Sequence, residues 1–154
     1  MKKLLYTLLA VSIIFSACEK DEEETPNTGN NNGNNITELE GTWLGDEVYA
    51  PGNILNQWVV IVSGNEMEYS GTSDSTEWYV GTYSINNQVN PKQYDLLITD
   101  CTNSSYIGTT AKGIYKIEND TTFTSSNCEP GSLDRPSSFF DNNVLSRSFI
   151  LTKQ

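Results

Sequence analysis

The 154-residue chain contains no histidine, and this absence removes most forms of nucleophilic catalysis. Serine and cysteine nucleophiles are usually activated by a histidine base, so neither a Ser-His-Asp triad nor a Cys-His pair can form. No serine lies in a Gly-x-Ser-x-Gly turn. The common hydrolase mechanisms are therefore excluded.

Carboxylate pairs are the next candidates, because two of them suffice for glycoside hydrolysis. Asp95 and Asp100 share one segment, but residues five apart on a strand face opposite sides and lie about 17 Å apart, too far for a catalytic pair. Glu47, Asp100 and Glu129 lie beside expected loops, yet nothing in the sequence would tune one of them as a base. We expect the protein not to be an enzyme.

Metal and phosphate sites also lack their sequence signals. Without histidine the cysteine spacing cannot complete a zinc site, and there is no Asp-x-Asp-x-Asp-Gly calcium loop. The glycine-rich run 29–33 does not lie between a strand and a helix, as a phosphate loop would. We expect no cofactor and no metal, and the net charge of −11 opposes nucleic-acid binding.

One cysteine is placed for covalent modification. Two lysines precede an apolar stretch, 4–15, that is too short to span a membrane and ends in Ser16-Ala17-Cys18. This ending resembles the bacterial lipobox, in which the cysteine sulfur receives a diacylglyceryl group. We expect residues 1–17 to be a signal peptide and Cys18 to be the membrane anchor; the alternative is an ordinary cleaved signal with an incidental cysteine.

The residues after Cys18 indicate a tether. The run 19–24, Glu-Lys-Asp-Glu-Glu-Glu, resembles the acidic surface-export signal of lipoproteins in one large group of Gram-negative bacteria, which implies a cell-surface, outer-membrane location. Alternatively, the charges only keep the tether solvated. Residues 25–35 are rich in Asn and Gly and predict a disordered spacer. The anchor, export signal and linker thus occupy 18–35, and one domain occupies 36–154.

Residues from Gly41 onward form β-branched and aromatic runs broken by Gly, Asn, Pro and Ser, with no long apolar series at helical spacing. This pattern predicts an all-β domain of eight strands. We place them at 41–49, 57–63, 66–71, 76–86, 93–100, 107–117, 121–128 and 146–153.

A simple antiparallel meander of these strands makes a barrel with two different ends. The short turns at 64–65, 87–92 and 118–120 fall at a closed end, and the longer loops surround an open mouth, where ligands usually enter small barrels. The apolar residues at or beside the mouth are Tyr49, Ile54, Leu55, Tyr106, Phe139 and Phe140. They are candidates for ligand or partner contact, or equally for a lid over the lumen.

Two further cysteines, Cys101 and Cys128, begin loops at the mouth end. An even pair in an oxidising compartment favours a disulfide, and flexible loop starts would allow it although the two strands are second neighbours. The alternative is two free thiols.

Five short motifs along the domain occur in the order seen in an uncharacterised bacterial lipocalin-like domain family. They are Leu39-Glu40-Gly41-Thr42-Trp43, Gly81-Thr82-Tyr83, Pro91-Lys92 followed by Asp95, Gly113-Ile114-Tyr115 with Asp120, and Arg135-Pro136 followed by Phe139. The resemblance spans Leu39 to Thr152 and implies an eight-stranded antiparallel up-and-down barrel, but no ligand or reaction.

Gly41-Thr42-Trp43 is also similar to the Gly-x-Trp signature of lipocalins, whose indole closes the narrow end of the barrel beneath a cation from the last strand. In the meander the last strand runs antiparallel to the first, so Lys153 comes near Trp43. The resemblance therefore implies that Lys153 stacks on Trp43 in place of the usual arginine.

We predict a membrane-anchored, non-catalytic binding module of the cell envelope, which captures a small ligand or an envelope protein at the barrel mouth. The competing hypothesis is a structural or envelope-assembly lipoprotein whose barrel is filled by side chains. A packed, dry interior would favour the second.

Overall fold

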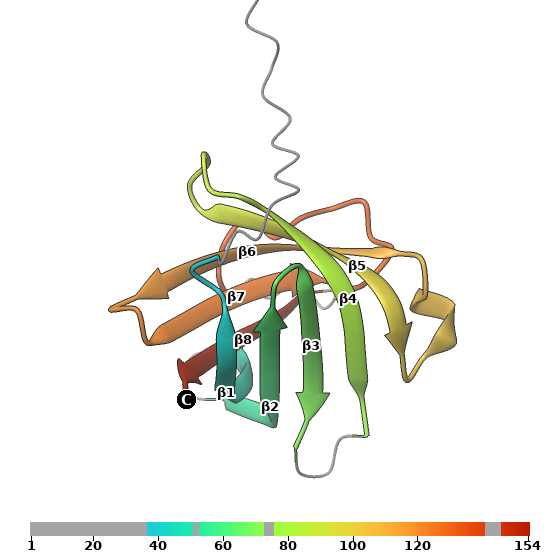
Figure 1. Cartoon of the computed structure of the whole chain (residues 1–154), viewed down its shortest axis with the longest axis horizontal. Coiled ribbons are helices and arrows are strands. Elements are labelled where there is room, and N and C mark those ends of the chain that lie inside the picture. Colours follow the sequence, from blue (N-terminus) through green and yellow to red (C-terminus); the bar gives the residue numbers. More distant parts are fainter. Residues whose placement is uncertain (1–36, 51–52, 73–75, 141–145) are drawn as a thin grey trace, which may run out of the picture. The chain divides into compact units, whose positions relative to one another are not determined.

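The computed structural model describes residues 37–50, 53–72, 76–140 and 146–154, which all fall within one compact unit. They form eight strands and one 3-10 turn (Figure 1). The elements are β1 (Gly41–Ala50), β2 (Asn53–Ser63), β3 (Glu66–Gly71), β4 (Trp78–Asn86), β5 (Lys92–Cys101), η1 (Ser104–Tyr106), β6 (Thr110–Glu118), β7 (Thr122–Cys128) and β8 (Ser146–Lys153).

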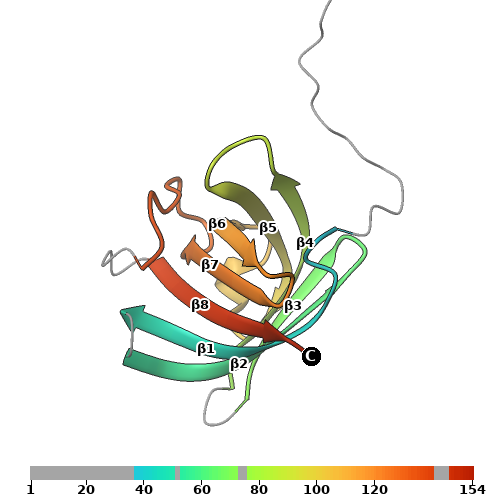
Figure 2. The same ribbon diagram turned by 90° about the vertical axis from the view of Figure 1, so that its left-hand side faces the viewer.

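Each strand pairs antiparallel with the next, and β8 pairs back onto β1, so the sheet closes into an up-and-down barrel. In Figure 2 β8 lies between β1 and β7, which completes the ring. The predicted fold class, an eight-stranded antiparallel barrel, is confirmed. Among the described residues, no helix has the length and apolar character needed to cross a membrane.

Two strand starts differ from the sequence prediction by three residues or more. β2 begins at Asn53 rather than at residue 57, because irregular pairing near Val48 extends the β1–β2 ladder as far as Ala50 and Asn53. β6 begins at Thr110 rather than at residue 107, because the chain first makes the η1 turn, which the Asn103 side chain caps. The alternation rule does not detect either feature, since both are local breaks in strand geometry.

Trp43 fills the closed end of the barrel. Its indole is fully buried, donates a hydrogen bond to the carbonyl oxygen of Leu39 at 2.7 Å and meets the edge of Phe123. Lys153, the register partner of Trp43, holds its ammonium 5.2 Å from the centroid of the indole ring. The expected contact between the last strand and this tryptophan is therefore present.

The sequence predicts the segment between β7 and β8 to be a mouth loop. In the structure this segment does not stay at the mouth. Residues 132–140 fold back along the outer wall of the barrel. Lys112 donates to the carbonyl oxygen of Leu133, and the Arg135 guanidinium donates to the carbonyl oxygens of Tyr94 and Gly113 and pairs with Asp95. The segment is held there by Arg135, which reaches backbone oxygens of β5 and β6, and by Lys112 of β6, which reaches a backbone oxygen of the segment.

Phe139 and Phe140, predicted at the mouth, lie on this outer wall instead. Lys116 of β6 holds its ammonium 5.5 Å from the centroid of the Phe139 ring, and the backbone N–H of Phe140 donates to the hydroxyls of Ser126 and Ser148. The outer faces of β6, β7 and β8 carry buried side chains, several of them polar. Residues 132–140 shield these side chains from solvent, which accounts for the position of the segment. The buried outward-facing residues are Ile114, Thr124, Ser126, Cys128 and Ser148.

The predictions for residues 1–35, including the signal peptide, Cys18 and the acidic run, lie outside the described residues. The boundary of the domain at residue 36 lies there too.

Gly113 is a testable point of close packing. A Cβ atom added at this inward position of β6 would lie 2.3 Å from the Tyr94 ring. Since Tyr94 is buried and its hydroxyl is hydrogen-bonded to Asn127, we expect Gly113→Ala to lower the free energy of unfolding by about 1–3 kcal/mol. Urea denaturation followed by tryptophan fluorescence measures the change. Ser84→Ala, on the exposed face of β4, is the matched control, and an equal effect of both variants would contradict the packing argument.

Candidate functional site

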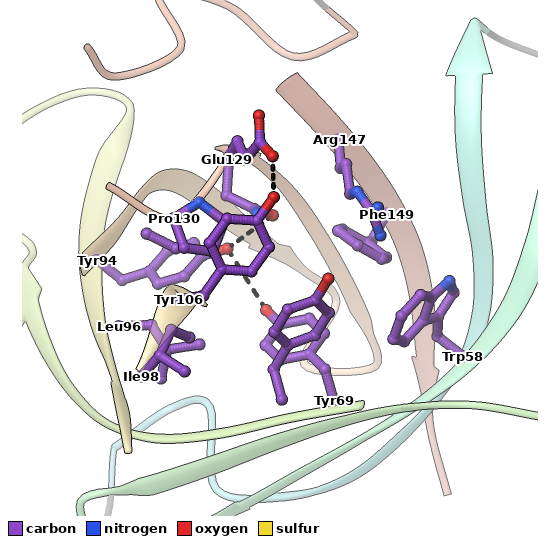
Figure 3. A pocket seen from close by; sticks show the side chains of 13 residues that line it. Trp58, Tyr69, Tyr94, Leu96, Ile98, Tyr106, Glu129, Pro130, Arg147 and Phe149 are labelled. Carbon is purple, nitrogen blue, oxygen red and sulfur yellow. Dashed lines mark hydrogen bonds between the residues drawn. The ribbon is translucent and has the colours of Figure 1, made fainter. Parts of the chain in front are cut away.

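A cavity of about 180 Å³ lies at the mouth end of the barrel, away from Trp43 (Figure 3). For scale, an engineered apolar cavity of about 150 Å³ accommodates one benzene molecule. The cavity is therefore large enough for a molecule with one ring. It is lined by Trp58, Tyr69, Tyr79, Tyr94, Leu96, Ile98, Tyr106, Ala111, Asn127, Glu129, Pro130, Arg147 and Phe149.

Aromatic side chains from five elements follow one another around the cavity wall. The ring centroids of Tyr106 and Tyr79 are 6.5 Å apart, those of Tyr79 and Trp58 6.4 Å, and those of Trp58 and Phe149 5.8 Å. Tyr69 continues the series at 5.5 Å from Phe149. These separations are those of packed aromatic pairs, so each ring is held by its neighbours.

The floor of the cavity contains two buried phenols. The hydroxyls of Tyr69 and Tyr94 are 3.4 Å apart, and Tyr94 donates to the side-chain oxygen of Asn127 at 3.2 Å. Burial raises the pKa of Tyr94 to about 12 and raises that of Tyr69 as well. Both groups are therefore neutral hydrogen-bonding groups at physiological pH.

Arg147 crosses the rim between two carboxylates. Its guanidinium lies 2.8 Å from Glu77 and 3.7 Å from Glu47. Glu47 is only 4% exposed and also accepts a hydrogen bond from the indole N–H of Trp58 at 2.9 Å. Burial alone would lower the pKa of Arg147, but the hydrogen bond to Glu77 and the charge of Glu47 raise it, so the group stays charged.

Tyr106 and Glu129 form another part of the rim (Figure 3). The Tyr106 hydroxyl donates a hydrogen bond to the Glu129 carboxylate. This bond raises the pKa of Tyr106 to about 12, because ionising the phenol would remove the donor and place a second negative charge there. The contact ties η1 to the end of β7 across the mouth.

The site thus offers aromatic rings, phenol hydroxyls and carboxylates. Among the described residues, no group of three or more side chains is arranged to hold a metal ion.

Of the six residues predicted at the mouth, Tyr106 lines the cavity. Ile54 and Leu55 are 63% and 56% exposed near the start of β2 and do not line it. Phe139 and Phe140 lie on the outer wall, as described above, and the side chain of Tyr49 is outside the described part of the chain. A position beside a predicted loop is therefore a weak predictor of which residues line the cavity.

Sequence reasoning missed the aromatic wall and Arg147 as site residues. Trp58, Tyr79 and Phe149 occupy inward positions of their strands near the mouth. Strand alternation, combined with the position of the closed end, could have identified these residues. Of the three loop-adjacent acids, Glu129 lines the cavity and Glu47 lies behind Trp58, whereas Asp100 is exposed and accepts a hydrogen bond from the backbone N–H of Cys101.

The predicted disulfide is absent from the structure, in which Cys101 and Cys128 are separate buried thiols. Both are the last residues of strands rather than members of flexible loops. Their strands are second neighbours, so about 10 Å separates the backbones, more than the roughly 7 Å that a disulfide spans.

The two thiols also face opposite sides of the wall. In β5 the pairing skips Thr99, and this bulge turns Cys101 into the core together with Ile98. Cys128 follows the inward-facing Asn127 and therefore points outward, on the face that residues 132–140 cover.

This geometry predicts two protected, unlinked thiols. With the folded chain and no reductant, iodoacetamide should leave Cys101 and Cys128 unmodified, because both are buried, and should alkylate both after denaturation. Intact mass spectrometry counts the added groups. A denatured, unreduced sample that takes up no label on these two cysteines and gains two daltons on reduction would contradict the structure. Cys101→Ser, which leaves one alkylation site of the pair, is the control.

No family model matches the chain, and no curated protein and no solved structure shows a significant match to it. The lipocalin-like resemblance of its motifs therefore remains a prediction, and the candidate site stands on its own geometry.

Proposed function

We propose that the protein is a non-catalytic binding module that takes a small ligand into the cavity at the mouth of its barrel. The single observation that carries this proposal is the distribution of filled and empty space. The closed half of the barrel is packed by Trp43, Tyr115, Phe123 and Leu151, all fully buried. The mouth half keeps a cavity of about 180 Å³ lined by aromatic rings.

The lining supports binding more than it supports a purely structural barrel. A barrel of eight strands is narrow enough for side chains to fill its interior completely. Here Ala111 lies among the lining residues, where a larger side chain would occupy the space. Polar groups with fixed partners stand at the rim, as they do in sites that orient a ligand.

A membrane anchor belongs to the same proposal. The sequence Ser16-Ala17-Cys18 after a short apolar stretch supports lipidation of Cys18, and the acidic run 19–24 supports export to the cell surface of an outer membrane. Trp43 beneath Lys153 at the closed end of an up-and-down barrel favours a lipocalin-like module as the exported domain.

The anchor has a direct test. When expressed in a Gram-negative host, the wild-type chain should partition into the membrane fraction and carry a mass increase of one diacylglyceryl group on an N-terminal peptide that begins at Cys18. Cys18→Ser should lose both properties because its hydroxyl does not replace the acceptor thiol. Cys128→Ser is the matched control and should retain the anchor. A wild-type chain that is cleaved elsewhere and lacks lipid would contradict the proposed membrane anchor.

Ligand capture is tested by native mass spectrometry of the full chain purified from its own envelope. We expect a reproducible small mass that is lost on denaturation. Ala111→Phe should abolish it, because the added ring enters the cavity, whereas Leu97→Phe adds the same ring to the exposed outer wall and should keep it. A bare polypeptide found only in complex with another envelope protein would instead favour the structural role.

A further inference from the structure

Resting on the proposed function, we infer that the ligand of this cavity is a small organic cation, namely a protonated amine or a quaternary ammonium group on a molecule with no more than one ring. Two independent features of the site carry the inference. One is the aromatic wall, and the other is the excess of negative charge around it.

The aromatic wall presents ring systems on several sides of one small space. Tyr106 and Tyr79 stand on one side of it, Trp58 and Phe149 follow, and Tyr69 reaches the floor. An aromatic ring is negative over its face, so a cation within about 6 Å of several ring centroids is attracted by each of them. The cavity volume of about 180 Å³ keeps any occupant close to these rings.

The formal charges near the cavity sum to a negative value. Glu47, Glu77 and Glu129 are carboxylates, and Arg147 is the cation among them. Arg147 is already engaged by two of these carboxylates, and the hydrogen-bond partner of Glu129 is the neutral phenol of Tyr106. Glu129 is exposed at the rim, and that partner does not balance its negative charge, so its carboxylate is available to pair with a cationic ligand.

The other described cations do not change this sum. Each has its contacts at the closed end of the barrel or on its outer wall, and none of them lines the cavity. They are Lys92, which pairs with Glu38; Lys112, which donates to Leu133; Lys116, which pairs with Glu118; Arg135, which pairs with Asp95; and Lys153, which stacks on Trp43. Arg147 is thus the one cation of the described chain that lines the cavity.

An anionic ligand is disfavoured by the same geometry. To bind Arg147 it would have to displace the carboxylate of Glu77 at 2.8 Å and come close to Glu47 and Glu129. A small ammonium group can approach Glu129 directly, with its N–H groups or its polarised methyl groups against the carboxylate oxygens. The negative electrostatic potential at the mouth therefore discriminates between ligands by their charge more than by their shape.

The test compares three probes of nearly equal size and different charge: benzylammonium, benzyl alcohol and benzoate. Each is titrated by calorimetry into the full mature chain, from which any bound molecule has been removed by denaturation and refolding. We expect benzylammonium to bind about tenfold more tightly than benzyl alcohol, and benzoate to bind most weakly.

Two variants separate charge from shape. Glu129→Gln keeps an acceptor for Tyr106 but removes the charge, so it should weaken benzylammonium about threefold to tenfold and leave benzyl alcohol unchanged. Tyr106→Leu removes a ring face while keeping apolar volume and should also reduce the preference for the cation. The control is Glu66→Gln, an exposed acid at the closed end, which should change neither probe.

The outcomes distinguish this inference from the proposed function. Benzyl alcohol or benzoate binding as tightly as benzylammonium would overturn the cation inference and leave a small-ligand pocket in place. Equal weakening of benzylammonium and benzyl alcohol by Glu129→Gln would overturn it too, because that result reports lost structure rather than lost charge. If no probe binds and no small mass accompanies the native chain, both proposals fall.

Discussion

The pairing of β8 with β1 is the constraint on which the rest of this structure depends. The six residue pairs from Trp43–Lys153 to Val48–Ser148 close the sheet, so no strand edge remains unpaired. Closure at eight strands also limits the interior to a width that side chains can fill. An internal cavity can then persist only where the inward side chains are too short or are held apart.

The two ends of the barrel meet this constraint in different ways. At the closed end, Trp43, Phe123 and Tyr115 are buried and pack edge to face. At the mouth, the small side chain of Ala111 faces a ring of aromatic groups that are held back against the wall by one another and by the buried Glu47. Packed neighbours therefore maintain the open space.

The outer wall explains an unusual feature of the chain. β7 reads Thr-Phe-Thr-Ser-Ser-Asn-Cys, too polar for a strand with one apolar face, yet most of it is buried. Residues 132–140 cover its outer face, where the Ser126 hydroxyl bonds Ser148 across the strands at 2.6 Å and receives the N–H of Phe140. On this outer face the polar strand is stabilised because the Ser126 hydroxyl is paired in this way, whereas on the inner face the buried Ser125 hydroxyl has no hydrogen-bond partner among the described residues.

The sequence by itself determined the number of strands, their order and the identity of the closed end. Alternation of apolar residues and short turns are local properties, and they are present in the structure. The Trp43–Lys153 contact is long-range, but it follows once the last strand is placed antiparallel to the first. Only the tertiary structure decided which residues line the cavity. The Thr99 bulge turns Cys101 inward, the β7–β8 segment carries Phe139 and Phe140 away from the mouth, and Arg147 meets Glu77 from a strand 70 residues distant in sequence. These outcomes depend on which groups from different strands and loops pair with one another in the closed barrel. The two-residue alternation within a single strand does not contain that information.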